Sequence, residues 1–227
     1  MIPSKYSYSE VLPIMRPITN SVAVVSFYKE NITTEVLEMQ RAVFSQFRMP
    51  LRQILFEGPG EDSCYHGKAI DQFLRRTTAK TVVLFDVDAV PLSSTAIPIL
   101  LGNIPGICGA AQQSNHKNVD HPYAGPSCVC FNMSLYHTLA NPSFEPDDKS
   151  DVGERLTWAA QSHNTPIALL TPIAYEKPGW RLGKVMEFGR STIYACQNGK
   201  PLIFHAFEAR KNPDRFVKAC RRILNGK

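Results

Sequence analysis

The alternation of apolar and polar residues in the first part of the chain predicts strands that alternate with helices. The apolar run Val22–Phe27 is typical of a short strand, and apolar residues then recur at helical spacing from Val36 to Phe47. A second strand is expected at Gln53–Phe56, and a second helix with its apolar face at Ala69–Leu74. The third strand, Thr81–Phe85, is apolar enough to be covered on both faces. This order of elements predicts a parallel sheet flanked by helices.

After the third strand the pattern is less regular, and the expected elements are shorter. They are helices at Ser94–Leu101 and about Val152–Gln161, strands at Ile107–Ala111, Cys128–Asn132 and Leu202–Phe207, and a C-terminal helix that starts at Pro213. The segment Glu176–Lys200 contains Pro178 and several glycines without a clear period, so we expect a long loop there. Long loops beside an α/β sheet often close over an active site, which makes this segment a candidate lid.

Length and composition indicate one globular domain. The chain has 227 residues, of which 44% are hydrophobic and 20% are charged, enough for a single buried core. Met1–Pro17 lacks the apolar stretch of a signal peptide, and runs such as Ala96–Leu101 are far shorter than the roughly 20 residues of a membrane helix. The six cysteines show no CxxC pair, so we expect reduced thiols and a cytoplasmic protein.

The positive charge of the chain is spread over its length. The formal net charge is +5, and the basic residues occur singly or in pairs rather than in a run. Proteins that bind nucleic acids concentrate their positive charge in a patch or a run, so this distribution does not favour a nucleic-acid partner. A ligand with a diphosphate group fits it better.

The strongest chemical signal is the sequence Asp86-Val87-Asp88, which directly follows the third apolar strand. Ligands of open α/β sheets bind at the carboxyl ends of the strands, where these two carboxylates are expected. Carboxylate oxygens are hard ligands that suit Mg²⁺ or Mn²⁺, and such an ion neutralises a diphosphate. The alternative is a strand end with two solvated aspartates, but the uninterrupted apolar run before them favours a metal site.

With this motif the chain resembles the GT-A glycosyltransferases, especially the family-2-like group, in which a short strand ends in a DxD motif. The resemblance covers most of the chain and is carried by the opening strand Val22–Tyr28, the helix start His66–Asp71, the DxD strand and the segment His205–Arg210. It implies an α/β fold of the GT-A type, a single Rossmann-like domain over residues 1–227 with a mixed central sheet flanked by helices. Residues 1 to about 112 would bind the nucleotide sugar, and residues from about 113 to 227 would bind the acceptor.

The resemblance also implies a metal-dependent transfer of a sugar from a UDP- or GDP-sugar to a hydroxyl group of a glycan or similar acceptor. In such enzymes the first loop and the loop after the second strand hold the nucleotide. The donor-binding residues implied in this way are Ser26, Phe27, Tyr28, Glu57, Asp86, Val87 and Asp88. Asp86 would face the ribose or base, Asp88 would bind Mn²⁺ or Mg²⁺, and His205 would supply a further metal contact. For His205, a histidine that only fills the core is an equal alternative.

Basic residues elsewhere suggest contacts to the diphosphate. His66 and Lys68 lie at a helix start, where free N–H groups and the helix dipole favour an anion, although a polar helix start without a ligand fits them equally. Arg210 and Lys184 are candidates to stabilise charge on the departing diphosphate, and surface solvation is the alternative for each.

Direct displacement at an anomeric carbon, which inverts its configuration, needs a carboxylate that takes the proton of the acceptor hydroxyl. Family-2-like enzymes place an aspartate near a helix start on the acceptor side, which here implies Asp151 as the base, with Glu154 as a second catalytic candidate. The same spacing of Asp and Glu also forms a capping box that simply starts a helix. The usual Glu-Asp pair of the family is absent, so the stereochemical outcome stays open. Tyr123 and Trp180 are candidates for acceptor binding because aromatic rings stack on sugars, and core packing explains them nearly as well.

Two other functions fit the same motif. In a haloacid-dehalogenase-like phosphatase, Asp86 would attack phosphorus and Asp88 would act as acid and base. That motif normally lies on the first strand, whereas two strand–helix units precede it here, and Asp147-Asp148 does not follow an apolar strand as the later acidic motif should. A non-catalytic module that binds a nucleotide is the third hypothesis.

Overall fold

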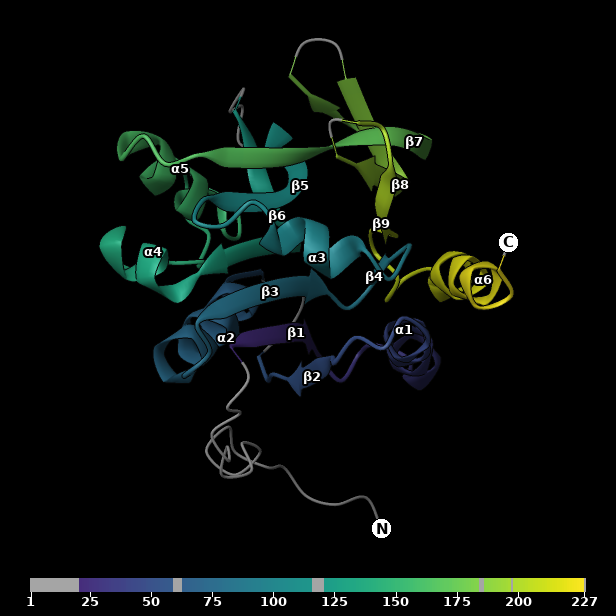
Figure 1. The fold of residues 1–227 in the computed structure, drawn as a ribbon. Helices are drawn as coiled ribbons and strands as arrows, with labels where there is room; N and C mark the ends of the chain where they lie inside the picture. Colours follow the sequence, from purple (N-terminus) through teal and green to yellow (C-terminus); the bar gives the residue numbers. More distant parts are fainter. Residues whose placement is uncertain (1–20, 59–62, 116–120, 184–185, 197, 227) are drawn as a thin grey trace.

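The computed structural model describes residues 21–58, 63–115, 121–183, 186–196 and 198–226. These residues form a nine-stranded sheet flanked by helices (Figure 1). The strand order is β2-β1-β3-β6-β5-β7-β8-β9-β4. The expected fold class, an α/β fold with a mixed central sheet flanked by helices, is confirmed.

The first part of the chain alternates strands with helices, as the apolar pattern predicts. Its elements are β1 (Val22–Tyr28), α1 (Thr34–Gln46), β2 (Arg52–Leu55), α2 (Ser63–Arg76) and β3 (Thr81–Asp86). β1 lies in the centre of this unit and pairs parallel with both β2 and β3. The carboxyl ends of the three strands therefore meet at one edge of the sheet.

β3 is covered on both faces because its successive side chains enter two different cores. Val83 and Phe85 pack in the core that contains the buried face of α1, and Val82 and Leu84 pack in the core that contains the buried face of α2. The first core also includes α6 (Pro213–Leu224), which lies beside α1 (Figure 1). This double burial explains the continuous apolar run that precedes Asp86.

The second part of the sheet is mostly antiparallel. Its elements are β4 (Ala89–Pro91), α3 (Ala96–Leu101), β5 (Ile107–Gln113), β6 (Pro122–Asn132), α4 (Met133–Thr138), α5 (Glu154–Ser162), β7 (Ile167–Leu182), β8 (Met186–Ala195) and β9 (Pro201–His205). β6 pairs antiparallel with both β3 and β5, and β5 pairs parallel with β7. The sheet is therefore mixed rather than parallel throughout, which corrects the expectation from the strand–helix alternation alone.

The segment Glu176–Lys200 is not the long loop that its composition predicts. β7 and β8 pair antiparallel from Thr171↔Ala195 to Leu182↔Met186, and β8 pairs with β9. The prediction of a long irregular loop is wrong, because strand hydrogen bonds organise most of this segment as a hairpin, and its role as a lid stays a prediction. The prolines of β7 lie beside register shifts of the pairing, where a strand tolerates a missing N–H donor. Lys184, a candidate cation of this segment, lies outside the described residues.

The cysteines whose side chains the structure describes are free thiols: Cys108, Cys128, Cys130, Cys196 and Cys220. Burial raises the pKa of the thiols of Cys108, Cys130 and Cys220 to about 12, which keeps them protonated and unreactive. Within the described ranges, no helix combines the length and the apolar character needed to cross a membrane.

Candidate functional site

Asp86, Asp88 and His205 converge at the carboxyl end of β3. We call these three residues, a candidate metal site, the metal cluster. One ligand atom of each residue lies within 4.8 Å of those of the other two. The Nε2 atom of His205 is 3.1 Å from Oδ1 of Asp88 and 3.7 Å from Oδ2 of Asp86. Two carboxylates and one imidazole at this spacing form a donor set that suits a divalent cation.

Sheet pairing brings these three residues together. Asp86 ends β3, Asp88 lies in the turn before β4, and β4 pairs antiparallel with β9 so that Ala89 is opposite His205. The N–H of Ala206 donates to the carbonyl oxygen of Asp88 over 2.9 Å, and the N–H of Ala209 donates to Oδ2 of Asp88 over 3.1 Å. These bonds fix the Asp88 carboxylate and direct its other oxygen, Oδ1, toward His205.

Gln40 of α1 supports the same turn from inside the protein. Its Nε2 atom donates to the carbonyl oxygens of Asp86, over 2.8 Å, and Ala89, over 3.0 Å. The Nε2 atom of Gln53 in turn donates to Oε1 of Gln40 over 2.9 Å. Gln40 is fully buried within the otherwise apolar face of α1. The sequence signal for Gln40 is a polar residue at a core position of an amphipathic helix.

His66 of α2 completes the group of titratable side chains. Its Nε2 atom is 3.8 Å from Oδ1 of Asp86. Burial lowers the pKa of His66, although the charges of Asp86, Asp88 and Asp151 act in the opposite direction. Burial raises the pKa of Asp86, against the attraction of His66 and His205. A bound cation would oppose this effect of burial, because a positive charge stabilises the carboxylate form.

Asp86 and Asp88 form part of the wall of a cleft with a volume of about 230 Å³, whereas His205 is buried behind them and does not line it. Most of the residues predicted to bind the donor line it: Phe27, Tyr28, His66, Asp86, Val87, Asp88 and Arg210. Aromatic rings and carboxylates thus line one open cleft, together with the cationic side chains of Lys29 and Arg210. Such a cleft combines a candidate metal site, an apolar surface and positive charge.

The remaining predicted donor residues lie elsewhere. Ser26 is fully buried in β1, and its Oγ atom has no hydrogen-bond partner among the described residues. Glu57 is exposed and does not line the cleft. Lys68 is also outside the cleft lining, and its Nζ atom lies 3.9 Å from Oε2 of Glu145.

The cleft also contains residues that the sequence did not single out: Lys29, Asn31, Ile32, Phe56 and Glu208. The first three belong to the loop after β1, which the resemblance assigned to nucleotide binding without identifying them. Glu208 has a φ of 65°, a backbone conformation that is uncommon outside glycine and that clusters at functional sites. Its carboxylate lies 3.6 Å from Nη1 of Arg190 and 3.6 Å from Nζ of Lys211.

Asp151 lies just before α5, and its charge acts on both His66 and Asp86, which places it near the cleft. Its Oδ1 atom accepts a hydrogen bond from the N–H of Val152 over 2.8 Å, and the hydroxyl of Tyr123 donates to Oδ2 over 3.4 Å. The second contact is long and therefore weak. The Asp151 carboxylate is half-buried and is not among the residues that line the cleft.

Glu154 is fully buried and fixes the start of α5. Its Oε2 atom accepts hydrogen bonds from the N–H of Asp151, over 2.8 Å, and from Oγ of Ser114, over 2.7 Å. The contact to the Asp151 N–H is one half of a capping box, the alternative considered for this pair, but the N-cap residue of α5 is Gly153 rather than Asp151. Burial raises the pKa of Glu154, but hydrogen bonds from His121, Ser114 and the Asp151 amide outweigh it and lower the pKa below its usual value. Glu154 is thus a stable buried carboxylate.

The two aromatic candidates for acceptor binding differ in position. Tyr123 is only 2% exposed, so its ring packs inside the protein. Trp180 is partly exposed and stacks on Phe188, with ring centroids 5.4 Å apart. Phe207 packs between Trp180, at 4.9 Å, and the ring of His205, at 3.9 Å. Trp180 therefore belongs to an aromatic cluster that reaches the metal cluster, and Tyr123 does not offer a ring face to a sugar.

Comparison with known proteins gives matches at the level of solved structures. No family model matches the chain, and no curated protein matches it. A mutant of Drosophila β1,4-galactosyltransferase 7 in complex with manganese, UDP-Gal and xylobiose matches with a TM-score of 0.48 and 10% identity, over 85% of this chain and 72% of that one. The mannosyltransferase PcManGT from Pyrobaculum calidifontis in complex with GDP-Man and Mn²⁺ matches with a TM-score of 0.45 and 15% identity, over 66% of this chain and 55% of that one. The chain is similar in fold to these glycosyltransferases.

The likeness to glycosyltransferases is incomplete, and it is shared with another class of enzyme. The chain spans only 63% of the length of a second structure of the Drosophila enzyme, in complex with xylobiose. It also matches an enzyme of another class, a putative glucose-1-phosphate thymidylyltransferase from Bacillus anthracis. That match has a TM-score of 0.46 and 8% identity, over 90% of this chain and 99% of that one. All of these TM-scores are below 0.5, so the function has to be argued from the residues of the cleft.

Proposed function

We propose that the protein is a metal-dependent glycosyltransferase that moves a sugar from a UDP- or GDP-sugar to a hydroxyl group of a glycan or similar acceptor. The observation that carries this proposal is the convergence of Asp86, Asp88 and His205 within 4.8 Å, with the two aspartates on the wall of a cleft. A buried carboxylate cluster is costly unless a cation or a proton compensates its charge. A metal ion that also binds a diphosphate explains both the cluster and the cleft.

The residues present fit a divalent cation. Asp88 has one carboxylate oxygen fixed by the Ala209 N–H, so the other is oriented without further loss of side-chain freedom. Mn²⁺ accepts both carboxylate oxygen and imidazole nitrogen, whereas Mg²⁺ prefers oxygen alone, so the presence of His205 favours Mn²⁺. When bound, the ion would neutralise charge on the diphosphate leaving group.

The other residues of the cleft have separate tasks in the proposed reaction. Phe27 and Tyr28 offer an apolar surface next to the metal cluster, suited to the nucleotide base. Lys29 and Arg210 place positive charge on the same cleft and favour the diphosphate. Asp151 is the proposed base that takes the acceptor proton in an inverting transfer. Glu154, buried and bonded to the Asp151 N–H, holds that residue in place rather than contacting the substrate.

The haloacid-dehalogenase-like alternative gains no support from the structure. Two strand–helix units precede β3, so the Asp86 motif does not follow the first strand. Asp147 lies in a loop and accepts hydrogen bonds from the N–H groups of Lys149 and Ser150. The non-catalytic module differs from the transferase only in turnover, which an assay decides.

The test is a screen of UDP- and GDP-sugars by thermal shift with and without Mn²⁺, followed by an assay of the best binder. A ligand that binds the native state alone raises the melting temperature. The proposal expects a shift that requires Mn²⁺ and slow release of UDP or GDP from the sugar. Release of phosphate from a generic phosphate ester would support the phosphatase instead. Metal-dependent binding without any release of nucleotide, over a range of acceptors, would support the binding module.

A further inference from the structure

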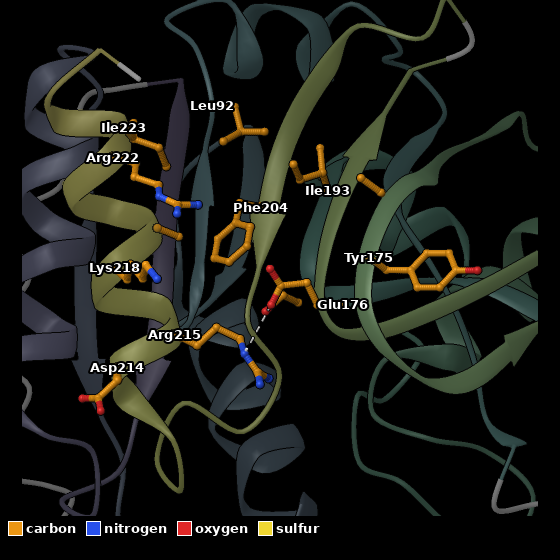
Figure 2. A pocket seen from close by; sticks show the side chains of 13 residues that line it. Leu92, Tyr175, Glu176, Ile193, Phe204, Asp214, Arg215, Lys218, Arg222 and Ile223 are labelled. Carbon is orange, nitrogen blue, oxygen red and sulfur yellow. Dashed lines mark ion pairs between the residues drawn. The ribbon is translucent and has the colours of Figure 1, made fainter.

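A second and larger hollow lies between α6 and the hairpin of β7 and β8, with β9 in its floor (Figure 2). We call it the α6 groove. Its volume is about 600 Å³, within the range of roughly 300 to 1,000 Å³ that is usual for small-molecule sites. It is distinct from the cleft, because the two share no lining residue.

The groove has an apolar floor. Leu92, Ile193, Phe204 and Ile223 line it, and Figure 2 shows Phe204 at its centre. Phe204 precedes His205 on β9, and successive side chains of a strand point to opposite faces. The groove therefore lies on the other side of the strand that carries the proposed metal ligand, and its floor suits a hydrocarbon chain.

One wall of the groove is cationic. Arg215, Lys218 and Arg222 lie three and four residues apart on α6, so they project from one face of the helix along the groove. Two carboxylates also line the groove. Asp214 points away from the other side chains in Figure 2, and Glu176 is 73% exposed and lies 3.9 Å from Nε of Arg215.

The cations exceed the charges that compensate them. The Arg215 side chain is only 18% exposed, yet its ion pair with Glu176 is long. Within the described part of the chain, Lys218 and Arg222 have no ion pair with a carboxylate. An apolar floor beside such a wall is complementary to a molecule with a hydrocarbon body and an anionic head.

We propose that the α6 groove binds a single-chain amphiphile with an anionic headgroup, such as an alkyl or acyl phosphate. The hydrocarbon chain packs on Phe204 and Ile193, and the phosphate lies against Lys218 and Arg222. This proposal is independent of the glycosyltransferase activity, because none of these residues lines the cleft.

The test is a calorimetric titration of the full chain with dodecyl phosphate below its critical micelle concentration. We expect one molecule to bind per chain. Octyl phosphate should bind more weakly, by about fourfold for each buried methylene that is removed. Inorganic phosphate and the neutral dodecyl maltoside should bind far more weakly, because each lacks one of the two recognition elements.

The chain offers a matched control for the cationic wall. Arg222→Gln should weaken dodecyl phosphate binding by about three- to tenfold, as for an exposed charge that contacts a phosphate group. Arg221→Gln removes the same charge from the neighbouring position, but Arg221 faces α1 and donates to Oε1 of Glu35 over 2.8 Å, so it should leave the affinity unchanged. Circular dichroism would check that both variants fold.

Three results would overturn the proposal. The first is the absence of dodecyl phosphate binding, or an equal loss in both variants. The second is binding only to vesicles of phosphatidylcholine and phosphatidic acid, with no affinity for the monomeric amphiphile, which would indicate attraction to a charged bilayer. The third is a dimer in sedimentation that dodecyl phosphate does not dissociate, which would mean that a second copy covers the groove.

Discussion

Asp88 is the most constrained side chain of the cleft, since both of its carboxylate oxygens have a partner. Replacing Asp88 by Asn keeps the size of the side chain and an oxygen for the Ala209 N–H, but it removes a negative charge from the proposed metal site. We expect Asp88→Asn to weaken Mn²⁺-dependent binding of UDP or GDP by about tenfold to 100-fold or more. Substitutions of residues that only orient metal ligands already lower metal affinity by that much. Calorimetric titration with Mn²⁺ and with chelator measures this.

Asp148→Asn is the control for that substitution, because Asp148 is exposed and lies outside the cleft lining. It removes an equal charge and should leave the affinity unchanged. Equal affinity of the Asp88→Asn protein and the unaltered chain would show that Asp88 and His205 form only a structural contact.

Asp151 is assigned a chemical role, and its substitution separates this role from helix capping. Asp151→Asn should preserve donor binding and lower turnover by about 10²- to 10⁴-fold, because a base acts in the chemical step. If Asp151 only starts α5, Asn replaces it well and the change is nearly silent. Steady-state turnover and donor affinity of Asp151→Asn decide between the two. Near-normal turnover would direct attention to Glu208, a carboxylate that does line the cleft and that has no proposed metal contact.

Asp86 and Asp88 could be picked out from the sequence because their type and place coincide with a simple rule, whereas His205 was suggested only by the family resemblance. Carboxylates directly after a buried strand lie at the edge where ligands bind. Gln40 and Glu208 follow no such rule. Gln40 acts through two backbone carbonyls that only the folded turn brings within reach, and Glu208 enters the cleft through an unusual backbone angle. Both depend on contacts between segments that are distant in the sequence.

At the scale of elements, α1 is coupled to the β3–β4 turn through Gln40. Gln40→Leu fills a similar volume but leaves the carbonyl oxygens of Asp86 and Ala89 without this donor. We expect the free energy of unfolding to fall by about 1–3 kcal/mol, the usual cost of an unsatisfied buried polar group. Urea denaturation measures this change, and Mn²⁺-dependent nucleotide binding should weaken in parallel.

Gln46→Leu is the matched control on the same helix. Gln46 is exposed, and its side chain makes only a long contact of 3.4 Å with the carbonyl oxygen of Ile223. Its substitution should change the free energy of unfolding by less than about 0.5 kcal/mol. Similar effects of both substitutions would mean that Gln40 does not hold the turn.

The elements that the apolar pattern identified are those buried on one or both faces. α1 and α2 repeat apolar residues at helical spacing, and β1 and β3 are short continuous apolar runs, so the pattern alone locates them. The β7–β8 hairpin has no such pattern. Ile173 and Tyr175 of β7 are 47% and 44% exposed, and Pro172 lies at a register shift. Its order comes from backbone pairing between strands, which side-chain periodicity does not report.

At the scale of the whole molecule, the buried network around Glu154 links stability to pH. The pKa of Glu154 lies below its usual value in the folded protein, so its contribution to stability is present above the pKa of the unfolded chain and is lost as the pH falls. The difference in free energy of unfolding between the unaltered chain and Glu154→Gln should therefore shrink on acidification below about pH 4.5. Urea denaturation between neutral and acidic pH measures it. A difference that is constant with pH would show that Glu154 is not ionised in the fold.

The division of the chain into donor and acceptor halves stays a prediction. The sheet mixes strands from both of these halves. β5 precedes residue 113 for most of its length but lies between β6 and β7, and β4 pairs with β9. A single sheet with interleaved strands has no surface along which two halves separate. The proposed donor and acceptor halves are therefore regions of one sheet.

The pairing of β4 with β9 also sets the order in which the metal cluster forms during synthesis. Asp88 and His205 are 117 residues apart along the chain. A ribosome adds roughly 5 to 20 residues each second, so Asp86 and Asp88 emerge roughly 6 to 23 seconds before the histidine. We expect a chain released before β9 to bind Mn²⁺ weakly or not at all in calorimetric titration. The nascent protein would therefore acquire the proposed metal ion only after β9 has been synthesised.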